Sequence, residues 1–191
     1  MVEAETLTRR GFLRVAGSAA WLAAGWPAVL AAAEQAAAAR DAGAAFETLA
    51  PDDAADLAAI AAQIFPTDAL PGANEAGVVY FMDSALRTFM VGAKEPVLAG
   101  LRDLNAKAAA VQPGARFAQL PAPEQVRLLQ AQEATPFFGT VHFMTIAGMF
   151  ALPVYGGNRG YAGWKMLGFE HRHFWQPPFG FYDAPAPGKK K

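Results

Sequence analysis

The sequence predicts a mainly α-helical fold, in which a small helical domain leads into a long, irregular C-terminal segment rich in glycine, proline and aromatic residues. Apolar residues recur at helical spacing in several stretches, and prolines or acids stand at the start of those stretches. No convincing alternation of apolar and polar residues, as in a half-buried β-strand, appears. The chain has 191 residues, of which 53% are apolar and 17% charged, so we expect one globular core.

The first helix is expected over residues 51–65. Pro51 and the acids after it suit a first helical turn, and Pro66 prevents the helix from continuing. Its apolar face consists of residues at helical spacing: Leu57, Ile60, Ala61 and Ile64. A proline-bounded loop over residues 66–72 should follow.

Further helices are expected along the rest of the domain. Asn74 can cap the second helix, Pro96 stands at the start of the third, Pro121 opens a shorter fourth, and Thr135 with Pro136 starts the next. Their apolar positions include Val78, Val79, Phe81, Met82, Leu86 and Phe89, then Leu98, Leu101, Leu104 and Ala108, then Val126, Leu128 and Leu129, and finally Val141, Met144 and Phe150.

Residues 1–33 have the pattern of a twin-arginine export signal. A pair of arginines precedes an apolar pair and a third basic residue, and a moderately apolar stretch with small residues follows. The signal residues are Thr8, Arg9, Arg10, Phe12, Leu13 and Arg14. We therefore expect a periplasmic protein that meets the twin-arginine translocase, with any cleavage near Ala33. The alternative is an ordinary amphipathic helix that begins with two arginines.

The expected organisation after the signal has two parts. Residues 34–45 are mostly alanine and should form a linker or a helical lead-in, and residues 46–191 should form the helical domain. Within that domain, residues 152–191 are expected to be an extended, partner-binding tail. Its aromatic residues need a surface to pack on, which is either the chain's own helices or a partner.

Composition excludes several classes of function. The formal net charge of −1 and the pI near 6.3 provide no basic field for nucleic acid. The chain has no cysteine, which excludes disulfides, thiolate zinc sites, iron–sulfur clusters and covalently attached haem. We expect no cofactor in this chain, so any redox chemistry would belong to a partner.

No residues form a convincing catalytic or metal site. His171 and His173 could share a metal with Glu170 nearby, but no further ligand has suitable spacing. His142 is expected to be a hydrogen-bonded packing residue. The acids of the domain are expected at helix starts or on exposed faces: Asp52, Asp53, Asp56, Glu75 and Asp83. The glycines of residues 154–158 are expected to make a tight turn that needs positive φ or close backbone approach, rather than a phosphate loop.

Residues 60–78, 153–158 and 163–169, together with the export signal, resemble the gluconate 2-dehydrogenase subunit 3 family, over roughly residues 46–170. The resemblance implies a non-catalytic small subunit of a membrane-associated, FAD-dependent sugar, sugar-acid or alcohol dehydrogenase. FAD would lie in a large flavoprotein partner, and haem c in a possible multihaem cytochrome partner. The subunit would supply the export signal and help the flavoprotein to fold.

The resemblance also suggests which residues bind the partner: Tyr155, Gly156, Gly157, Asn158, Trp164, Lys165, Phe169 and Trp175. After Phe169, residues 170–173 depart from the proline–glycine turn expected of the family. The runner-up function is an independent exported enzyme or binder of metal or sugar that uses His171, His173 and Asn158. A third is a structural envelope protein that needs no flavoprotein.

Overall fold

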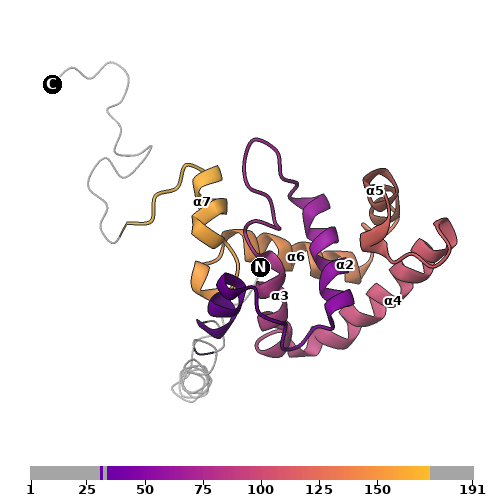
Figure 1. Ribbon diagram of the computed structural model, residues 1–191, viewed down its shortest axis with the longest axis horizontal. Helices are drawn as coiled ribbons and strands as arrows, with labels where there is room; N and C mark the ends of the chain where they lie inside the picture. The colour runs from indigo at the N-terminus through magenta and orange to yellow at the C-terminus, as the bar shows by residue number, and fades with distance from the viewer. Residues whose placement is uncertain (1–30, 32–33, 173–191) are drawn as a thin grey trace, which may run out of the picture.

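The computed structural model describes residue 31 and residues 34–172, which form packed helices joined by short turns (Figure 1). No strand occurs in these residues, which confirms the predicted mainly α fold. Residues 34–42 are helical. The other helices are α2 (Pro51–Ile64), α3 (Val78–Arg87), α4 (Lys94–Val111), α5 (Ala122–Gln130), α6 (Pro136–Phe150) and α7 (Ala162–Met166), with 3-10 turns η1 (Val91–Ala93), η2 (Phe117–Gln119), η3 (Pro153–Tyr155) and η4 (Arg159–Tyr161).

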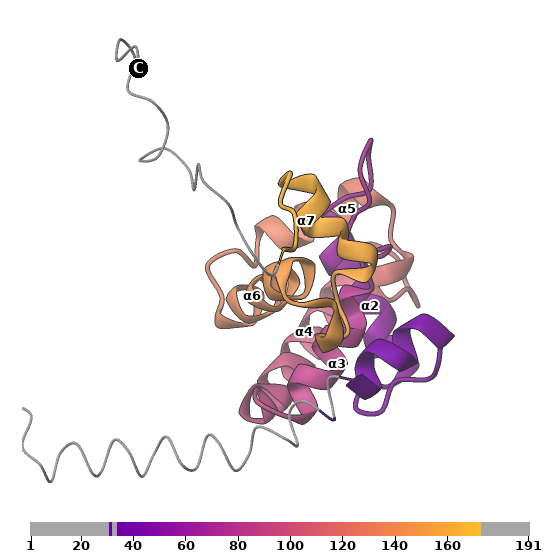
Figure 2. The same cartoon turned by 90° about the vertical axis from the view of Figure 1, so that its left-hand side faces the viewer.

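The core lies between α2, α3, α4 and α6, with α3 packed along α6 and α2 against both. Most of the predicted apolar positions point into it, but Phe89 lies beyond the end of α3 and is 54% exposed, and Val126 on α5 is also exposed. Its largest fully buried side chains are Phe117, Leu57, Ile60, Met82, Leu86, Leu101, Leu104, Met144, Met149, Val78, Val97 and Val141. Seen from the side, α7 and the turns before it cover one end of α6 (Figure 2). No helix in the described ranges combines the length and the apolar character that crossing a bilayer requires.

Most helix starts follow the sequence, and one does not. Thr135 caps α6 by accepting a hydrogen bond from Phe138 N at 3.2 Å, with Pro136 in the first turn. Asn74, in contrast, does not cap α3. That helix begins after Gly77, whose φ of 70° is left-handed, and backbone hydrogen bonds over residues 72–78 form a turn in its place. α4 begins at Lys94, just ahead of the expected Pro96.

Asp56 is not the helix-start or exposed-face acid that its position suggested, because its side chain is fully buried. It accepts hydrogen bonds from Arg116 Nε at 3.0 Å and Nη2 at 2.6 Å, from Asn105 Nδ2 at 2.7 Å and from Ala118 N at 3.0 Å. Asn105 Oδ1 in turn accepts from Phe117 N at 2.8 Å. We call Asp56, Asn105 and Arg116 the carboxylate corner, since they tie α2, α4 and η2 together.

Asp83 is a second buried acid that was expected to be exposed. Its carboxylate accepts hydrogen bonds from the backbone N–H groups of Glu47, Thr48 and Leu49 at 2.8 to 3.0 Å. Those residues lie in the irregular segment before α2, where no helical or strand partner exists for their donors. Asp83 therefore supplies an acceptor that the backbone N–H group of buried Leu49 would otherwise lack, and it also binds the two residues before Leu49.

Candidate partner-binding site

The turn at residues 155–158 is fastened to the end of α6 by close backbone approach. A Cβ atom added to Gly157 would lie 2.0 Å from Gly148 O, and one added to Gly163 would lie 2.1 Å from Met149 O. Gly156 has a φ of 97°. The expectation of positive φ and close approach is thus confirmed at these glycines. We call Gly148, Gly157 and Gly163 the glycine interface.

Asn158 joins the two sides of the glycine interface. Its side chain is fully buried. Its Nδ2 donates to Ala151 O at 2.8 Å, and its Oδ1 accepts from Gly163 N at 3.0 Å. Both polar atoms of the amide therefore have partners within the chain, and the buried side chain is out of reach of a ligand such as a sugar or a metal.

Trp164 attaches α7 to α6 with its indole. Nε1 donates to Phe150 O at 2.7 Å, an acceptor freed at the helix end. The chain then reverses after α7: Gly168, with a φ of 65°, donates to Lys165 O at 3.1 Å, and Phe169 N donates to Trp164 O at 2.8 Å. This is a Schellman ending, and the usual apolar contact is present as the edge-on packing of Phe169 on Trp164.

The result is a surface that we call the aromatic face: Tyr161, Trp164, Leu167 and Phe169. Leu167 is 66% exposed, and Tyr161 and Phe169 are also exposed. A groove of about 490 Å³ runs along it, lined by Phe150, Trp164, Leu167, Gly168 and Phe169. Lys165 is exposed on the same short helix. Apolar groups at this density on rigid backbone are typical of a protein contact.

Two of the stretches that carry the resemblance, residues 60–78 and residues 153–158, meet in space, and we call them the two family motifs. Arg159 N donates to Ala76 O at 3.0 Å, and a Cβ on Gly77 would lie 3.5 Å from Gly156 O. Arg40 lies between them and is 7% exposed. Its guanidinium donates to Gly157 O at 2.6 Å and to Pro153 O at 3.2 Å. The hydrogen bond from Arg40 also holds the pKa of Asp41 below its usual range, with a smaller contribution from Arg159.

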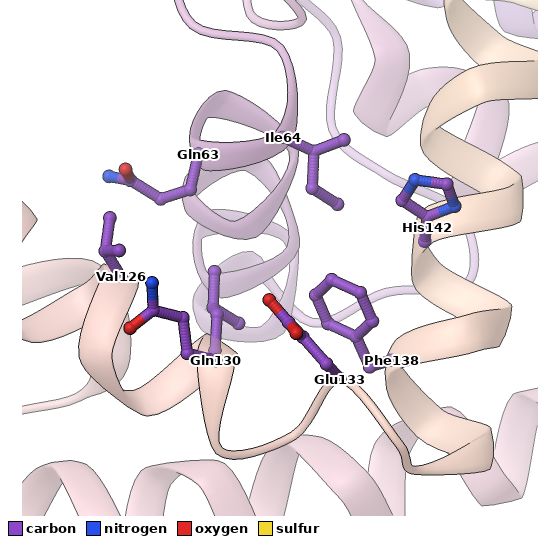
Figure 3. Close-up of a pocket in the computed structure, with 8 residues that line it drawn as sticks. Gln63, Ile64, Val126, Gln130, Glu133, Phe138 and His142 are labelled. Carbon is purple, nitrogen blue, oxygen red and sulfur yellow. The ribbon is translucent and has the colours of Figure 1, made fainter.

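A second groove, of about 370 Å³, lies between α2, α5 and α6 and is lined by Gln63, Ile64, Val126, Leu129, Gln130, Glu133, Phe138 and His142 (Figure 3). His142 is not the packing residue expected, because it is exposed and stacks on Phe138 at 5.9 Å between ring centroids. No hydrogen bond of its imidazole fixes a tautomer there, as a general base would need. This groove therefore offers no catalytic arrangement.

The residues proposed for metal binding do not form a cluster in the described part. His171 stacks on Tyr161 at 5.9 Å and lies 5.2 Å from the Trp164 ring. Across residues 34–172, no group of three or more His, Cys, Asp or Glu side chains is placed to hold a metal ion. His173, Trp175 and the export-signal residues Thr8, Arg9, Arg10, Phe12, Leu13 and Arg14 lie outside the described residues, so their roles stay predictions.

Sequence reasoning missed Arg40 altogether, since it lies in an alanine-rich stretch. The sequence feature that could have pointed to it is that Arg40 is the one basic residue in residues 34–45. A charge of either sign would have kept that stretch solvated, so the choice of arginine indicates a specific contact.

The fold and this surface define a class: a small helical protein whose polar networks are internal and whose exposed apolar face is suited to another protein. Residues 51–170, more than half of the chain, match the protein family described as Gluconate 2-dehydrogenase subunit 3. The chain belongs to this family. A search of curated proteins and one of solved structures returned no match.

Proposed function

We propose that the chain is the non-catalytic small subunit of an exported, FAD-dependent dehydrogenase complex acting on a sugar, sugar acid or alcohol. Its aromatic face docks on the large flavoprotein subunit, and its N-terminal signal carries both chains through the twin-arginine translocase to the periplasm. Membrane association would come through the complex, with a multihaem cytochrome c as a possible third partner. FAD and haem would lie in the partners.

The observation that supports this best is the aromatic face itself, on a chain whose family name is that of a dehydrogenase subunit. α7 is too short to hold its shape alone, yet it is tied to α6 by Trp164 Nε1, by Asn158 and by the contact at Gly163. The chain thus holds exposed Leu167 and Phe169 on a preorganised support. Preorganisation lowers the entropy cost of binding a partner.

The direct test is co-purification. The tagged full chain, recovered from its native host, is expected to bring down a dehydrogenase-sized flavoprotein in stoichiometric amount, seen by flavin absorbance. A colourless, soluble and cooperatively folded chain that is recovered alone would contradict the proposal.

A substitution on the aromatic face tests whether the partner binds there. Leu167→Asp should lower the yield of complex by roughly tenfold or more, because it places a charge in a desolvated contact, while leaving the stability of the chain within about 0.5 kcal/mol. The matched control is Val91→Asp on η1, since Val91 is 62% exposed and lies off this face. Equal yields from the two variants would show that the partner binds elsewhere.

A further inference from the structure

The helix at residues 34–42 packs on a seat formed by both family motifs. A Cβ atom on Gly77 would lie 2.4 Å from Arg40 Cδ, and one on Gly156 would lie 2.9 Å from Ala36 Cβ. Figure 2 shows this helix in indigo beside the turns that precede α7. The space for it thus exists because glycines from two distant stretches face it.

Arg40 binds this seat through groups that only the folded chain brings together. The guanidinium donates to the carbonyls of Gly157 and Pro153, more than a hundred residues away along the chain. Those carbonyls converge because Gly157 is pressed on Gly148 and because Arg159 N is bonded to Ala76 O. Both carbonyls accept from Nη1, while Nε and Nη2 donate to the carboxylate of the neighbouring Asp41 at 3.0 and 3.1 Å, which orients the guanidinium. Nη1 can reach both carbonyls only when the turn has its finished geometry, so the contact depends on that geometry.

The part of this helix that the structure describes behind residue 33, residues 34–42, has few other buried contacts with the domain. Apart from Ala36 and Arg40, its described residues are exposed or half-buried. Without the seat, residues 34–42 would therefore lose their buried contacts with the domain, whereas Ala44 and Phe46 would keep theirs with Tyr80.

We propose that residues 34–42 form a latch, closed by Arg40, that orders the stretch directly behind the export signal only when the two family motifs have come together. The proposal rests on the export role proposed above. In a chain whose glycine interface has not yet formed, residues 34–42 are not held on the domain, and the segment behind the signal resembles that of an unfolded cargo. In a finished chain, residues 34–42 directly behind the signal are held on the folded domain, so the latch couples export to folding.

The test compares Arg40→Ala with Arg127→Ala in the full chain, co-expressed with its flavoprotein. The Arg127 side chain donates its hydrogen bonds to the nearby Glu124 on α5. Arg127 is therefore a matched arginine with no role in the latch. Arg40→Ala should speed hydrogen exchange of amides 34–44 by roughly tenfold or more, without changing protection of α2 and α6. The exported fraction should fall several-fold, and Arg127→Ala should leave both readouts unchanged.

Arg40→Lys provides a second, milder variant should Arg40→Ala fail to fold, since lysine keeps the charge and the stem but loses the planar fork. Its exchange and export should lie between those of Arg40→Ala and the unaltered chain. Wild-type protection of residues 34–44 in the variants would overturn the latch, as would unchanged export from a chain whose segment has opened.

An Arg9→Lys, Arg10→Lys double variant distinguishes a failure of the proposed export function from a failure of the latch. If this change leaves the flavoprotein's location unaltered, the proposed export function is wrong. If it blocks export while Arg40→Ala does not, only the latch is wrong.

Discussion

Around Asp56, hydrogen bonds between charged and polar side chains join neighbouring elements. Around Gly157, backbones are in direct contact, because the glycines there have no side chains to separate them. The carboxylate corner gathers donors from α4, η2 and the Arg116 side chain on one buried carboxylate. The glycine interface lets the backbones of α6 and the following turn touch. Polar side chains can adjust by rotating, but two backbones in contact cannot.

The difference bears on what each region does. The carboxylate corner uses its polar groups internally and stabilises the core, whereas the glycine interface lies directly beneath the aromatic face. A rigid backbone contact fixes the position of α7 relative to α6, and with it the groove at Trp164 and Phe169. Changes at the corner should therefore affect stability alone, and changes at the glycine interface should affect both stability and binding.

The largest effect on stability is expected from Asp56→Ala. Removing a buried carboxylate that serves several donors costs about 3–5 kcal/mol, and partial exposure of Arg116 lets it regain water, so the loss should lie near the lower end. Urea unfolding would measure it, with Asp52→Ala as the control, because Asp52 is exposed and 4.0 Å from Arg116 Nη1. A loss below about 1 kcal/mol would mean that the corner is not an anchor.

Gly157→Ala should be the next largest, at about 1–3 kcal/mol, because the new methyl group meets Gly148 O and the backbone must shift. Unlike Asp56→Ala, it should also lower the complex yield in the folded fraction. Gly139→Ala in α6 is the opposing control, since a Cβ there meets nothing within 4 Å, and it should stabilise by about 0.5–1 kcal/mol. A folded Gly157→Ala chain that binds its partner normally would remove the distinction between the two regions.

Helical periodicity carried most of the fold. Leu57, Ile60 and Ala61 are buried as their spacing predicts, because such local patterns depend only on one element's own geometry. The turn at residues 155–158 was also predictable, since adjacent glycines have few other uses. Predictions failed where a residue's environment is set by hydrogen-bond partners that are distant in sequence.

Asp56 and Asp83 show why. Each acid sits where charge suits a helix, and nothing nearby in sequence indicates that Arg116, some sixty residues away, or the N–H groups of residues 47–49 will reach it. Asn74 failed as a cap for a related reason, because the left-handed Gly77 set the helix start. Arg40 stands out in the sequence as the one basic residue of its alanine-rich stretch, but its distant acceptors could not be foreseen, because they are the backbone carbonyls of Pro153 and Gly157.

The smallest effect is expected at Glu75, and it tests whether a carboxylate that accepts several hydrogen bonds must be buried to stabilise the fold. Glu75 repeats the chemistry of Asp56 at an exposed position, where it accepts from Thr67 Oγ1 at 2.7 Å and Gly72 N at 3.0 Å. The Thr67 hydrogen bond first, and the backbone donors after it, lower the pKa of Glu75 below its usual 4.5.

Since the folded pKa of Glu75 is the lower one, its contribution to stability is present above the unfolded pKa and is lost as pH falls through the folded value. Glu75→Gln should cost only a few tenths of a kcal/mol at neutral pH, because solvent screens the group. The two chains' free energies of unfolding should converge under acid. A cost comparable to that of Asp56→Ala would show that the hydrogen bonds matter and burial does not. A difference that persists at low pH would assign the effect to packing of the loop rather than to charge.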